Sequence, residues 1–368
     1  MSSLTMGVEE EFLLVDRRSR LPVDRGPAVV EAAAEELGAL VQTEFYTSQV
    51  EVCTTPTDDC GELREELARL RRTVSSAAAD AGCRPVASGT AVLPPERPLT
   101  VTPSARYRRM ARRYSALVGG YDALACGCHV HVGTLDRAQA LGLANRMRPW
   151  LPALQSLAGN SPFARGRDTG QASRRPAVFA RWPTAGPAPV VTEAGYEAVV
   201  ASLVDRGILL DRRMVYWYAR PSEHVPTLEI RVADTNADVD TVVLLAALVR
   251  GLAASLLPEV VEELPLPRLP ERQLRQAHAR AAAYGLAGPG LDPVTGAEVT
   301  GERLLDMLLA RAAPGLESAG DLALVEEQLD RLRAEGDGAA RQRAVHERRR
   351  GNLRAVVDAL AAATALEP

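Results

Sequence analysis

The segment GVEEEF, residues 7–12, places three consecutive glutamates between apolar residues near the start of the chain. Its pattern predicts a β-strand, in which successive side chains point to opposite faces. Glu9 and Glu11 then share one face, while Glu10 lies with the apolar residues on the other. Two neighbouring carboxylates repel each other unless a cation lies between them, and oxygen ligands suit Mg²⁺ or Mn²⁺. The alternative is a solvated acidic strand, which the apolar flanks disfavour.

A second strand is predicted in CGCHVHVG, residues 126–133, which carries four soft donors close together. Strand geometry puts Cys126 and Cys128 on one face and His129 and His131 on the other, so all four cannot close on one zinc ion. The cysteines are interpreted as small core residues. The histidines face a ligand or, as the alternative, form hydrogen bonds within the sheet.

The segment LEIRV, residues 228–232, predicts a third strand in which Glu229 and Arg231 share a face. One interpretation is an ion pair within the sheet. The other is a metal-binding carboxylate beside a guanidinium that holds a phosphoryl group.

Residues 43–55 are read as a further strand, ending before Pro56. Glu44 and Glu51 are seven positions apart, an odd number, so a β-bulge must lie between them if both reach one site. Gln49 shares the face of Glu51 and is a candidate for hydrogen bonding to substrate.

The order of elements predicts an α+β fold. Strands and helices are mixed up to residue 238, and the pattern from 239 onward is almost entirely helical. We expect a curved antiparallel or mixed sheet with helices on its outer face, in a single domain over residues 1–368. Its sheet-rich part is 1–238, and its helical part, 239–368, packs on that sheet. Residues 161–190 are rich in Gly, Pro and Arg and are expected to form a functional loop.

The amino-acid composition excludes several classes of function. The 368 residues carry a net charge of −4, and all 43 cationic side chains are arginine. The absence of lysine excludes a phosphate-binding P-loop and a Schiff-base mechanism. The balanced charge predicts neither nucleic-acid binding nor a polybasic membrane patch.

Five sparse cysteines and an N-terminus without signal-peptide features lead us to expect a cytoplasmic protein with reduced thiols. The apolar stretch 241–261 is interrupted by Arg250, Gly251 and Pro258, which predicts a buried helix.

These motifs together resemble the carboxylate–amine ligases of the glutamate–cysteine ligase type 2 family, within the glutamine synthetase-like superfamily. The resemblance covers nearly the whole chain and rests on GVEEEFLLVD (7–16), SQVEV (48–52), GCHVHVG (127–133), NRMRPWLPAL (145–154), NSPF (160–163), GRDTG (166–170), RWPTAGP (181–187), PTLEIRVAD (226–234), ALVRGL (247–252) and GAARQR (338–343).

The resemblance implies a funnel-shaped active site in which ATP phosphorylates a carboxylate, by default the γ-carboxylate of glutamate, and an amine, by default that of cysteine, displaces phosphate. It implies ATP, two or three Mg²⁺ or Mn²⁺ ions and, as a family expectation, a homodimer. The implied metal ligands are Glu9, Glu11, Glu44, Glu51, His129 and Glu229. Glu229 and Arg231 are the implied catalytic residues, and Arg231, Arg220 and His131 the implied phosphate contacts. The substrate contacts expected are Gln49, Gln171, Arg174, Arg175, Arg181 and Tyr218.

This sequence departs from the family in the substrate region. The family loop GYASYR is GQASRR here (170–175), Phe179 replaces a tryptophan, and Tyr218 stands where an aspartate is common. A ligase of a specialised pathway with a different acid or amine is therefore an alternative. A metal-dependent amidohydrolase, suggested by the two histidines, and a regulatory protein on a ligase frame are further alternatives.

Overall fold

The computed structural model describes residues 3–118, 120, 123–266 and 269–367. The strands of the main sheet are β1 (Met6–Asp16), β2 (Val41–Thr43), β3 (Gln49–Cys53), β4 (Cys83–Val86), β5 (Gly127–Val132), β8 (Ala219–Pro221) and β9 (Leu228–Asp234). Two short hairpins are formed by β6 (Phe163–Ala164) with β7 (Arg167–Asp168) and by β10 (Gly290–Leu291) with β11 (Glu298–Val299).

Helices lie between these strands and after them. The α-helices are α1 (Gly26–Leu37), α2 (Cys60–Asp80), α3 (Ala105–Arg113), α4 (Arg137–Met147), α5 (Leu151–Leu157), α6 (Arg175–Phe179), α7 (Glu193–Asp205), α8 (Val239–Val261), α9 (Glu271–Tyr284), α10 (Gly301–Ala319), α11 (Leu322–Glu335), α12 (Gly338–Arg348) and α13 (Leu353–Thr364). Short 3₁₀ turns are η1 (Gly38–Leu40), η2 (Arg212–Met214) and η3 (Gly285–Ala287).

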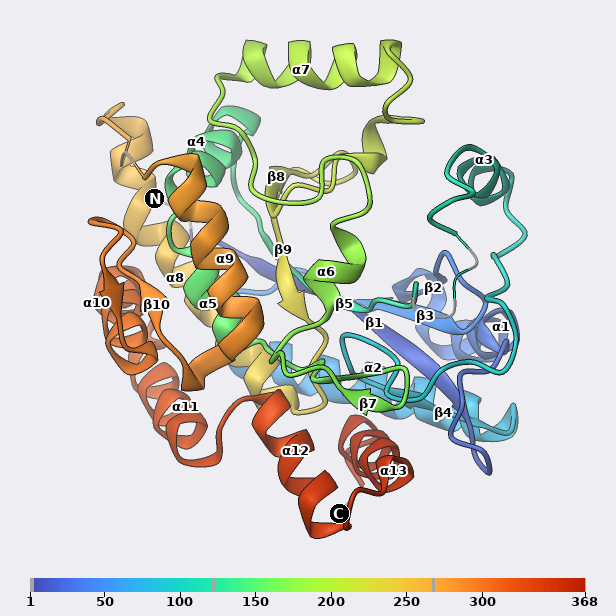
Figure 1. Ribbon diagram of the computed structural model, residues 1–368. Coiled ribbons are helices and arrows are strands. Elements are labelled where there is room, and N and C mark those ends of the chain that lie inside the picture. Colours follow the sequence, from blue (N-terminus) through green and yellow to red (C-terminus); the bar gives the residue numbers. More distant parts are fainter. Residues whose placement is uncertain (1–2, 119, 121–122, 267–268, 368) are drawn as a thin grey trace.

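The long strand β1 organises the main sheet. The strand order is β2-β3-β1-β5-β9-β8, and β4 pairs with the end of β1 beyond β5. In the described part of the chain, neighbouring strands of this sheet run antiparallel. Figure 1 shows β1, β5 and β9 passing through the middle of the molecule, with helices around them. The predicted α+β fold with an antiparallel sheet and helices toward the C-terminus is confirmed.

One face of the sheet packs on helices. Val8, Val130 and Ile230, from three neighbouring strands, form one hydrophobic cluster with residues of α2, α4, α5, α8 and α10. Burying this apolar surface is the main favourable contribution to folding. Glu10 also points to this face, where Arg71 of α2 pairs with its carboxylate at 2.5 Å, and both side chains are fully buried.

Helix α8 lies inside this cluster. It is the one helix among the described residues that is long and apolar enough to cross a membrane by length and composition, and 83% of its apolar window is buried in the structure. Arg250, which interrupts the apolar stretch, is also buried and pairs with Asp321. The predicted buried helix is therefore found, and the charge of Arg250 within it is neutralised by Asp321.

The segment 43–55 differs from the sequence prediction. Instead of one bulged strand, it contains the end of β2, a turn and β3, and β2 pairs with β3 through Gln42 opposite Glu51. Thr47 and Ser48 form the turn, so the chain reverses between Glu44 and Glu51. The reversal, rather than a bulge, allows both carboxylates to approach one site. The β-branched and aromatic residues of this segment resemble those of a continuous strand, which concealed the hairpin.

Helix α4 begins with a capping box, in which the Asp136 carboxylate accepts a hydrogen bond from the Gln139 backbone. The short strand β8 follows the 3₁₀ turn η2 and begins only at Ala219.

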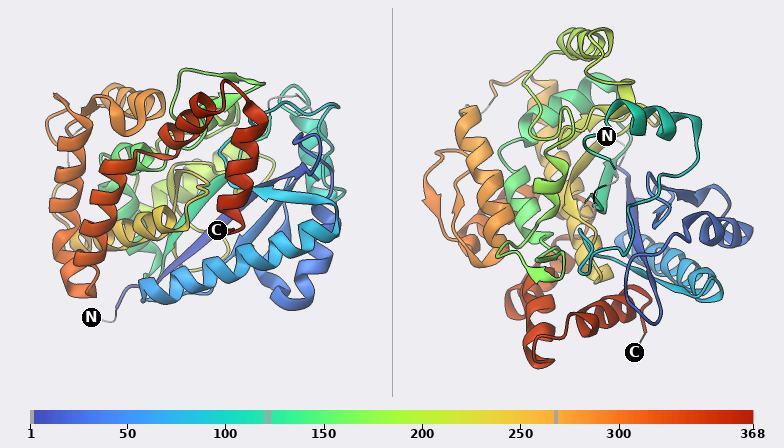
Figure 2. Two further views of the ribbon diagram at one scale, coloured as in Figure 1. Left: turned by 90° about the horizontal axis from the view of Figure 1, so that it is seen from below. Right: turned by 45° about the vertical axis from the view of Figure 1, so that its right-hand side comes forward.

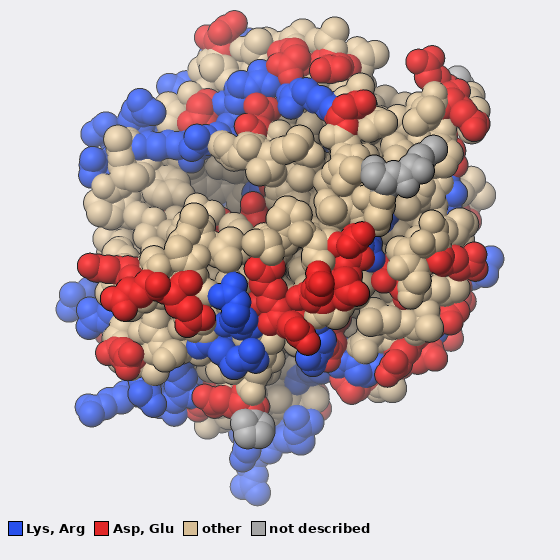
Figure 3. All heavy atoms as spheres, turned by 180° about the vertical axis from the view of Figure 1, so that it is seen from behind, with Lys and Arg blue, Asp and Glu red and all other residues tan. Residues whose placement is uncertain are grey.

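The helices after residue 238 surround one side and one end of the sheet. Helices α8, α10 and α11 share the hydrophobic cluster of the sheet, and α13 contacts β4. Figure 2 shows the α12–α13 pair near the C-terminus. On the face seen in Figure 3, arginine and acidic side chains lie next to each other rather than in separate regions. The division of the domain at residue 238 remains a prediction.

Candidate active site

The second face of the sheet carries the charged residues predicted from the sequence. The register places Glu11 opposite Glu51 of β3, Glu9 opposite His129 of β5, and His131 opposite Glu229 of β9. Directly opposite residues in antiparallel strands have Cβ atoms about 4.5–5.5 Å apart. Antiparallel pairing therefore turns separate sequence motifs into one continuous polar row.

A β-bulge adds Arg231 to this row. The pairing of β5 with β9 shifts between Cys128 and Val130, where β9 has one additional residue opposite His129. The Arg231 Nη1 atom lies 3.3 Å from His129 Nδ1 and also contacts the Glu229 carboxylate. The bulge thus brings the guanidinium to the centre of the row, which the sequence pattern alone did not predict.

Glu9 connects the two histidines. Its carboxylate lies 3.0 Å from His129 Nδ1 and 3.3 Å from His131 Nε2. Burial tends to raise the pKa of Glu9, but hydrogen bonds with the two imidazoles hold it well below its usual range. Burial, followed by Arg231, lowers the pKa of His129. A neutral imidazole is the form that binds a metal ion.

Three groups of side chains have donor atoms within 4.8 Å of one another. They are Glu9 with His131 and Glu229, Glu9 with Glu51 and Cys53, and Glu11 with Glu44 and Glu51. The shared members make these groups one continuous cluster. The carboxylates predicted to bind metal, Glu9, Glu11, Glu44, Glu51 and Glu229, are all brought together here.

The cluster fits divalent cations by its charge and its donor set. Burial and the Glu11 carboxylate raise the pKa of Glu44 to about 7. Burial, Glu9 and Glu44 hold the pKa of Glu51 well above its usual range. Proton uptake would be unfavourable beside a bound cation, so these raised pKa values express negative charge that the protein alone does not neutralise. Carboxylate oxygens are the ligands of Mg²⁺ and Mn²⁺.

Both histidines lie at the cluster beside Glu9, and their roles remain predictions. His131, expected at ATP phosphate, belongs to one of the three donor groups, and its Nδ1 atom lies 2.8 Å from Thr227 Oγ1. His129, expected as a metal ligand, belongs to none of the groups found among the described residues. Its buried Nε2 atom lies 3.8 Å from the Glu11 carboxylate and has no hydrogen-bond partner among the described residues.

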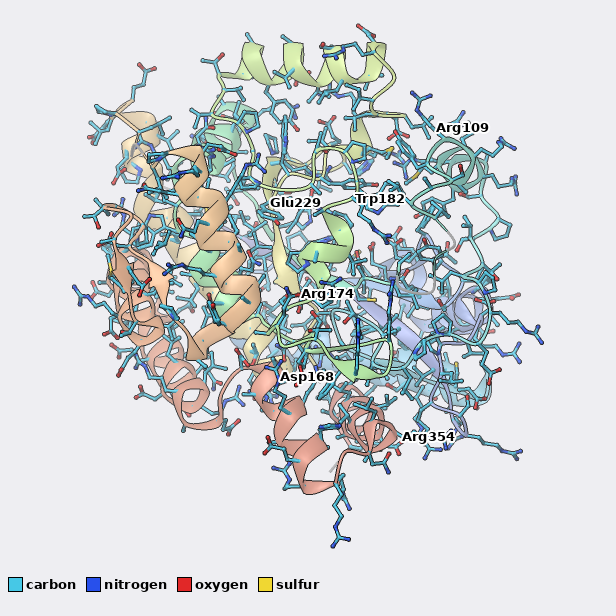
Figure 4. The ribbon with its side chains drawn as sticks, in the orientation of Figure 1. Arg109, Asp168, Arg174, Trp182, Glu229 and Arg354 are labelled. Carbon is cyan, nitrogen blue, oxygen red and sulfur yellow. The ribbon has the colours of Figure 1, made fainter. Side chains whose placement is uncertain are left out.

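Glu229 is held between two arginines. Arg220 Nε donates to it at 2.8 Å, and Arg231 contacts its other oxygen. Burial would raise the pKa of Glu229, but Arg231 and Arg220 hold it well below its usual range. Arg220, expected at phosphate, also donates to the backbone oxygen of Val215, so its guanidinium already has several partners. Figure 4 places Glu229 near the middle of the molecule, whereas Arg109 and Arg354 lie at its periphery.

Arg175 is the predicted substrate residue that reaches this cluster. Its buried guanidinium donates to the Arg231 backbone oxygen at 3.2 Å. A Cβ atom on Gly127 would lie 2.4 Å from Arg175 Nη2 and 3.0 Å from His129 Nε2. Glycine at position 127 therefore leaves the space that the guanidinium occupies.

The other predicted substrate residues contact neighbouring protein groups. Arg174 Nη1 is 3.5 Å from Gln171 Oε1, and Arg181 is exposed with its Nε 3.4 Å from the Val178 oxygen. Tyr218 is half-buried against the His278 ring, with centroids 4.6 Å apart. Gln49 is buried, and its amide donates to the Ala125 oxygen at 2.9 Å. Their contacts with substrate remain predictions.

Several residues of the site were missed in the sequence. Cys53 joins Glu9 and Glu51, and its spacing of two from Glu51 was the available signal. Tyr216 lies under the Arg231 guanidinium, 5.9 Å from the ring centroid, and contacts Trp182. No local motif marks an aromatic residue that meets the site only after folding.

Comparison with known proteins agrees with the fold and the motifs. The model of glutamate–cysteine ligase family 2 matches residues 5–359. A protein of Salinispora arenicola with the name "Putative glutamate–cysteine ligase 2" is 44% identical over 369 residues, covering 100% of this chain and 97% of that protein. A protein of Saccharopolyspora erythraea with the name "Putative glutamate–cysteine ligase 2-1" is 45% identical over 351 residues. The match covers 95% of this chain and 92% of that protein.

Two solved structures share the fold. The glutamate–cysteine ligase of Francisella tularensis in complex with AMP has a TM-score of 0.74 at 14% identity, covering 100% of this chain and 89% of that chain. A bifunctional glutathione synthetase from Pasteurella multocida has a TM-score of 0.70 at 14% identity, covering 99% of this chain and 52% of that chain.

The sequence relatives, together with this fold and acidic site, define an enzyme that uses ATP to join a carboxylate to an amine through a C–N bond. The chain belongs to the glutamate–cysteine ligase family 2.

Proposed function

We propose that the protein phosphorylates the side-chain carboxylate of glutamate, or of a closely related acid, and joins it to an amine, with cysteine as the default amine. The observation that carries this proposal is the convergence of carboxylates from β1, β3 and β9 and the β2–β3 turn beside Arg231. The names of the sequence relatives support the same pair of substrates.

The chemistry explains why such a site is required. A carboxylate resists amine attack because oxide is a very poor leaving group. A carboxylate oxygen attacks the γ-phosphorus of ATP, the bond to ADP breaks, and an acyl phosphate forms. The amine nitrogen then attacks the acyl carbon, phosphate leaves with the bonding electrons, and the nitrogen loses a proton to solvent.

The residues of the cluster would lower both barriers by neutralising charge. Glu9, Glu11, Glu44, Glu51 and Glu229, with histidine, would hold two or three Mg²⁺ or Mn²⁺ ions. When bound, these ions supply positive charge between the polyphosphate and the attacking carboxylate. Arg231 would direct its guanidinium to the transferred phosphoryl group, and Arg220 would hold Glu229 in place. Arg175 would bind phosphate or the substrate carboxylate.

The remaining features of the proposal concern the setting of the reaction. The substrates are small molecules, and we propose a cytoplasmic enzyme that can form a homodimer. The drift at Gln171, Arg174 and Tyr218 makes a related acid or a different amine the second candidate.

The deciding experiment measures ADP and phosphate release with Mg·ATP, glutamate and a panel of amines that includes cysteine. We expect ADP formation to require both the acid and Mg²⁺, and mass spectrometry to detect the amide. Preference for another acid or amine would support the second candidate. Amide hydrolysis without ATP would contradict the ligase proposal and favour the amidohydrolase, and nucleotide binding without turnover on any acid would favour a regulatory protein.

A further inference from the structure

Asp234 is a buried carboxylate outside the cluster of carboxylates and histidines described above. It is the last residue of β9, three positions after Arg231, and its side chain is 2% exposed. Burial raises its pKa, and this rise is opposed by the charge of Arg175 and by hydrogen bonds from Ser161, Asn160 and Ser173.

Asp234 joins two separate segments of the loop predicted to be functional. Its Oδ2 atom accepts hydrogen bonds from Ser161 Oγ at 2.7 Å and from the Asn160 backbone at 2.9 Å. Its Oδ1 atom accepts one from Ser173 Oγ at 2.8 Å. A Cβ atom on Gly89 would lie 2.5–2.8 Å from the carboxylate, so the backbone at residue 89 packs directly on it.

Ser161 passes this restraint to the arginine segment. While its hydroxyl donates to Asp234, its oxygen accepts from the backbone nitrogens of Arg174 at 2.8 Å and Arg175 at 3.2 Å. The same two segments also pair through Ser161 and Ser173. Orientation of the Ser161 hydroxyl toward a carboxylate leaves its lone pairs directed at the two N–H groups.

The restrained segment delivers Arg175 to the site. Helix α6 begins at Arg175, whose guanidinium donates to the Arg231 oxygen and fills the space beside Gly127. Strand β9 thus carries Glu229 and Arg231 directly and, through Asp234, fixes the backbone from which Arg175 extends. Both arginines take their positions from one strand.

We infer that Asp234 is a positioning residue that sets Arg175 against the reacting groups through Ser161 and Ser173. This inference rests on the proposed function for its kinetic consequence. A carboxylate suits the position because it only accepts hydrogen bonds and has oxygens for all three donors. An amide offers one accepting oxygen and places an NH₂ group against a donor.

The test is a double-mutant cycle with Asp234→Asn and Arg175→Ala, read out as kcat/KM for ADP formation. Asp234→Asn removes one charge-assisted hydrogen bond from the series that links Asp234 to Arg175. In the wild-type background this loss is expected to lower kcat/KM by about 10- to 100-fold. If Asp234 acts through Arg175, the same change in the Arg175→Ala background should lower it by less than about 3-fold. An equal loss in both backgrounds would overturn the inference, because it would show a role independent of Arg175.

Hydrogen exchange provides a readout that needs no turnover. The peptide covering residues 172–180 contains the Arg174 and Arg175 amides bonded to Ser161. The amide hydrogens of this peptide should exchange faster in Asp234→Asn than in the wild type. An unchanged melting temperature would show that the variant keeps its fold. Unchanged exchange would contradict the positioning role, and this measurement decides the matter if Arg175→Ala has no detectable activity.

Two further variants separate positioning from loss of the fold. Ser173→Ala removes one donor while keeping the carboxylate, and it should produce a smaller loss of the same kind. Ser88→Ala is the matched control, because its buried hydroxyl donates to the Asn160 and Thr90 oxygens and not to Asp234; kcat/KM should not change. If Asp234→Asn does not fold, Ser173→Ala with unchanged exchange and unchanged kcat/KM would overturn the inference.

Absence of turnover in the wild-type protein would refute the proposed function, while the exchange measurement would still test the positioning of Arg175 by Asp234.

Discussion

Replacing Arg231 by lysine tests the phosphate-binding centre most sharply, because the positive charge is kept and only the guanidinium is lost. Arg231 is one-tenth exposed in its side chain, contacts Glu229 and lies 3.3 Å from His129. An ammonium cannot hold Glu229 and present a second N–H fork to a phosphoryl group. Removing one preorganised donor of this kind costs roughly 2.7–4 kcal/mol in the barrier, or about 10²–10³ in kcat.

The assay for Arg231→Lys is ADP release at saturating Mg·ATP and acid substrate, followed by thermal unfolding of the same samples. Arg20→Lys is the control, because Arg20 makes a two-point contact with Asp358 at 3.0 and 3.1 Å on the partly exposed surface. We expect kcat to fall only in Arg231→Lys. A kcat within about 3-fold of the wild-type value would refute the reasoning, since the arginine would then serve the sheet and not the phosphoryl group.

Three more predictions concern charge and stability. Glu229→Gln should abolish ADP formation and also lower the free energy of unfolding by about 3–5 kcal/mol in urea titrations, because it leaves two buried guanidiniums without their anion; normal turnover would remove Glu229 from the catalytic site. Burial, followed by Arg148 and Arg275, lowers the pKa of His278 to about 3, so the folded state stays neutral where the unfolded state takes up a proton. The contribution of neutral His278 to the free energy of unfolding is complete above about pH 6.5. It is lost as the pH falls toward 3, by up to about 5 kcal/mol. The slope of stability against pH in that window should therefore be smaller in His278→Gln than in the wild type or in the exposed control His224→Gln, and equal slopes would contradict it. Asp136→Ala should cost about 1 kcal/mol of stability by removing the cap of α4, without changing kcat; unaltered stability in urea would show that the cap contributes nothing.

Spacing within single strands predicted much of the site. The alternation of side chains correctly placed Glu9 with Glu11 and Glu229 with Arg231, since this pattern is local to each strand. It also placed Glu10 on the opposite face, where the structure shows the buried pair with Arg71.

Relations between strands could not be predicted in the same way. The bulge opposite His129 depends on how β5 and β9 pair, and no residue within either strand specifies it. The hairpin that brings Glu44 toward Glu51 was concealed because its turn lies among residues that also favour strands. The Gln49 amide also bonds to the Ala125 oxygen on the neighbouring segment, a contact that depends on the tertiary structure, while its contact with substrate stays a prediction. Register and turns, which depend on the tertiary structure, account for these differences.

Binding of Mn²⁺ tests the central claim that carboxylates from separate strands hold the same divalent ions. Free Mn²⁺ would be measured by electron paramagnetic resonance during titration of the wild type, Glu9→Gln and Glu51→Gln, with the exposed Glu347→Gln as the control. The structure predicts that the first two variants each weaken binding, although their residues lie on β1 and β3, and that the control binds like the wild type. Wild-type affinity in both Glu9→Gln and Glu51→Gln would contradict the shared metal centre.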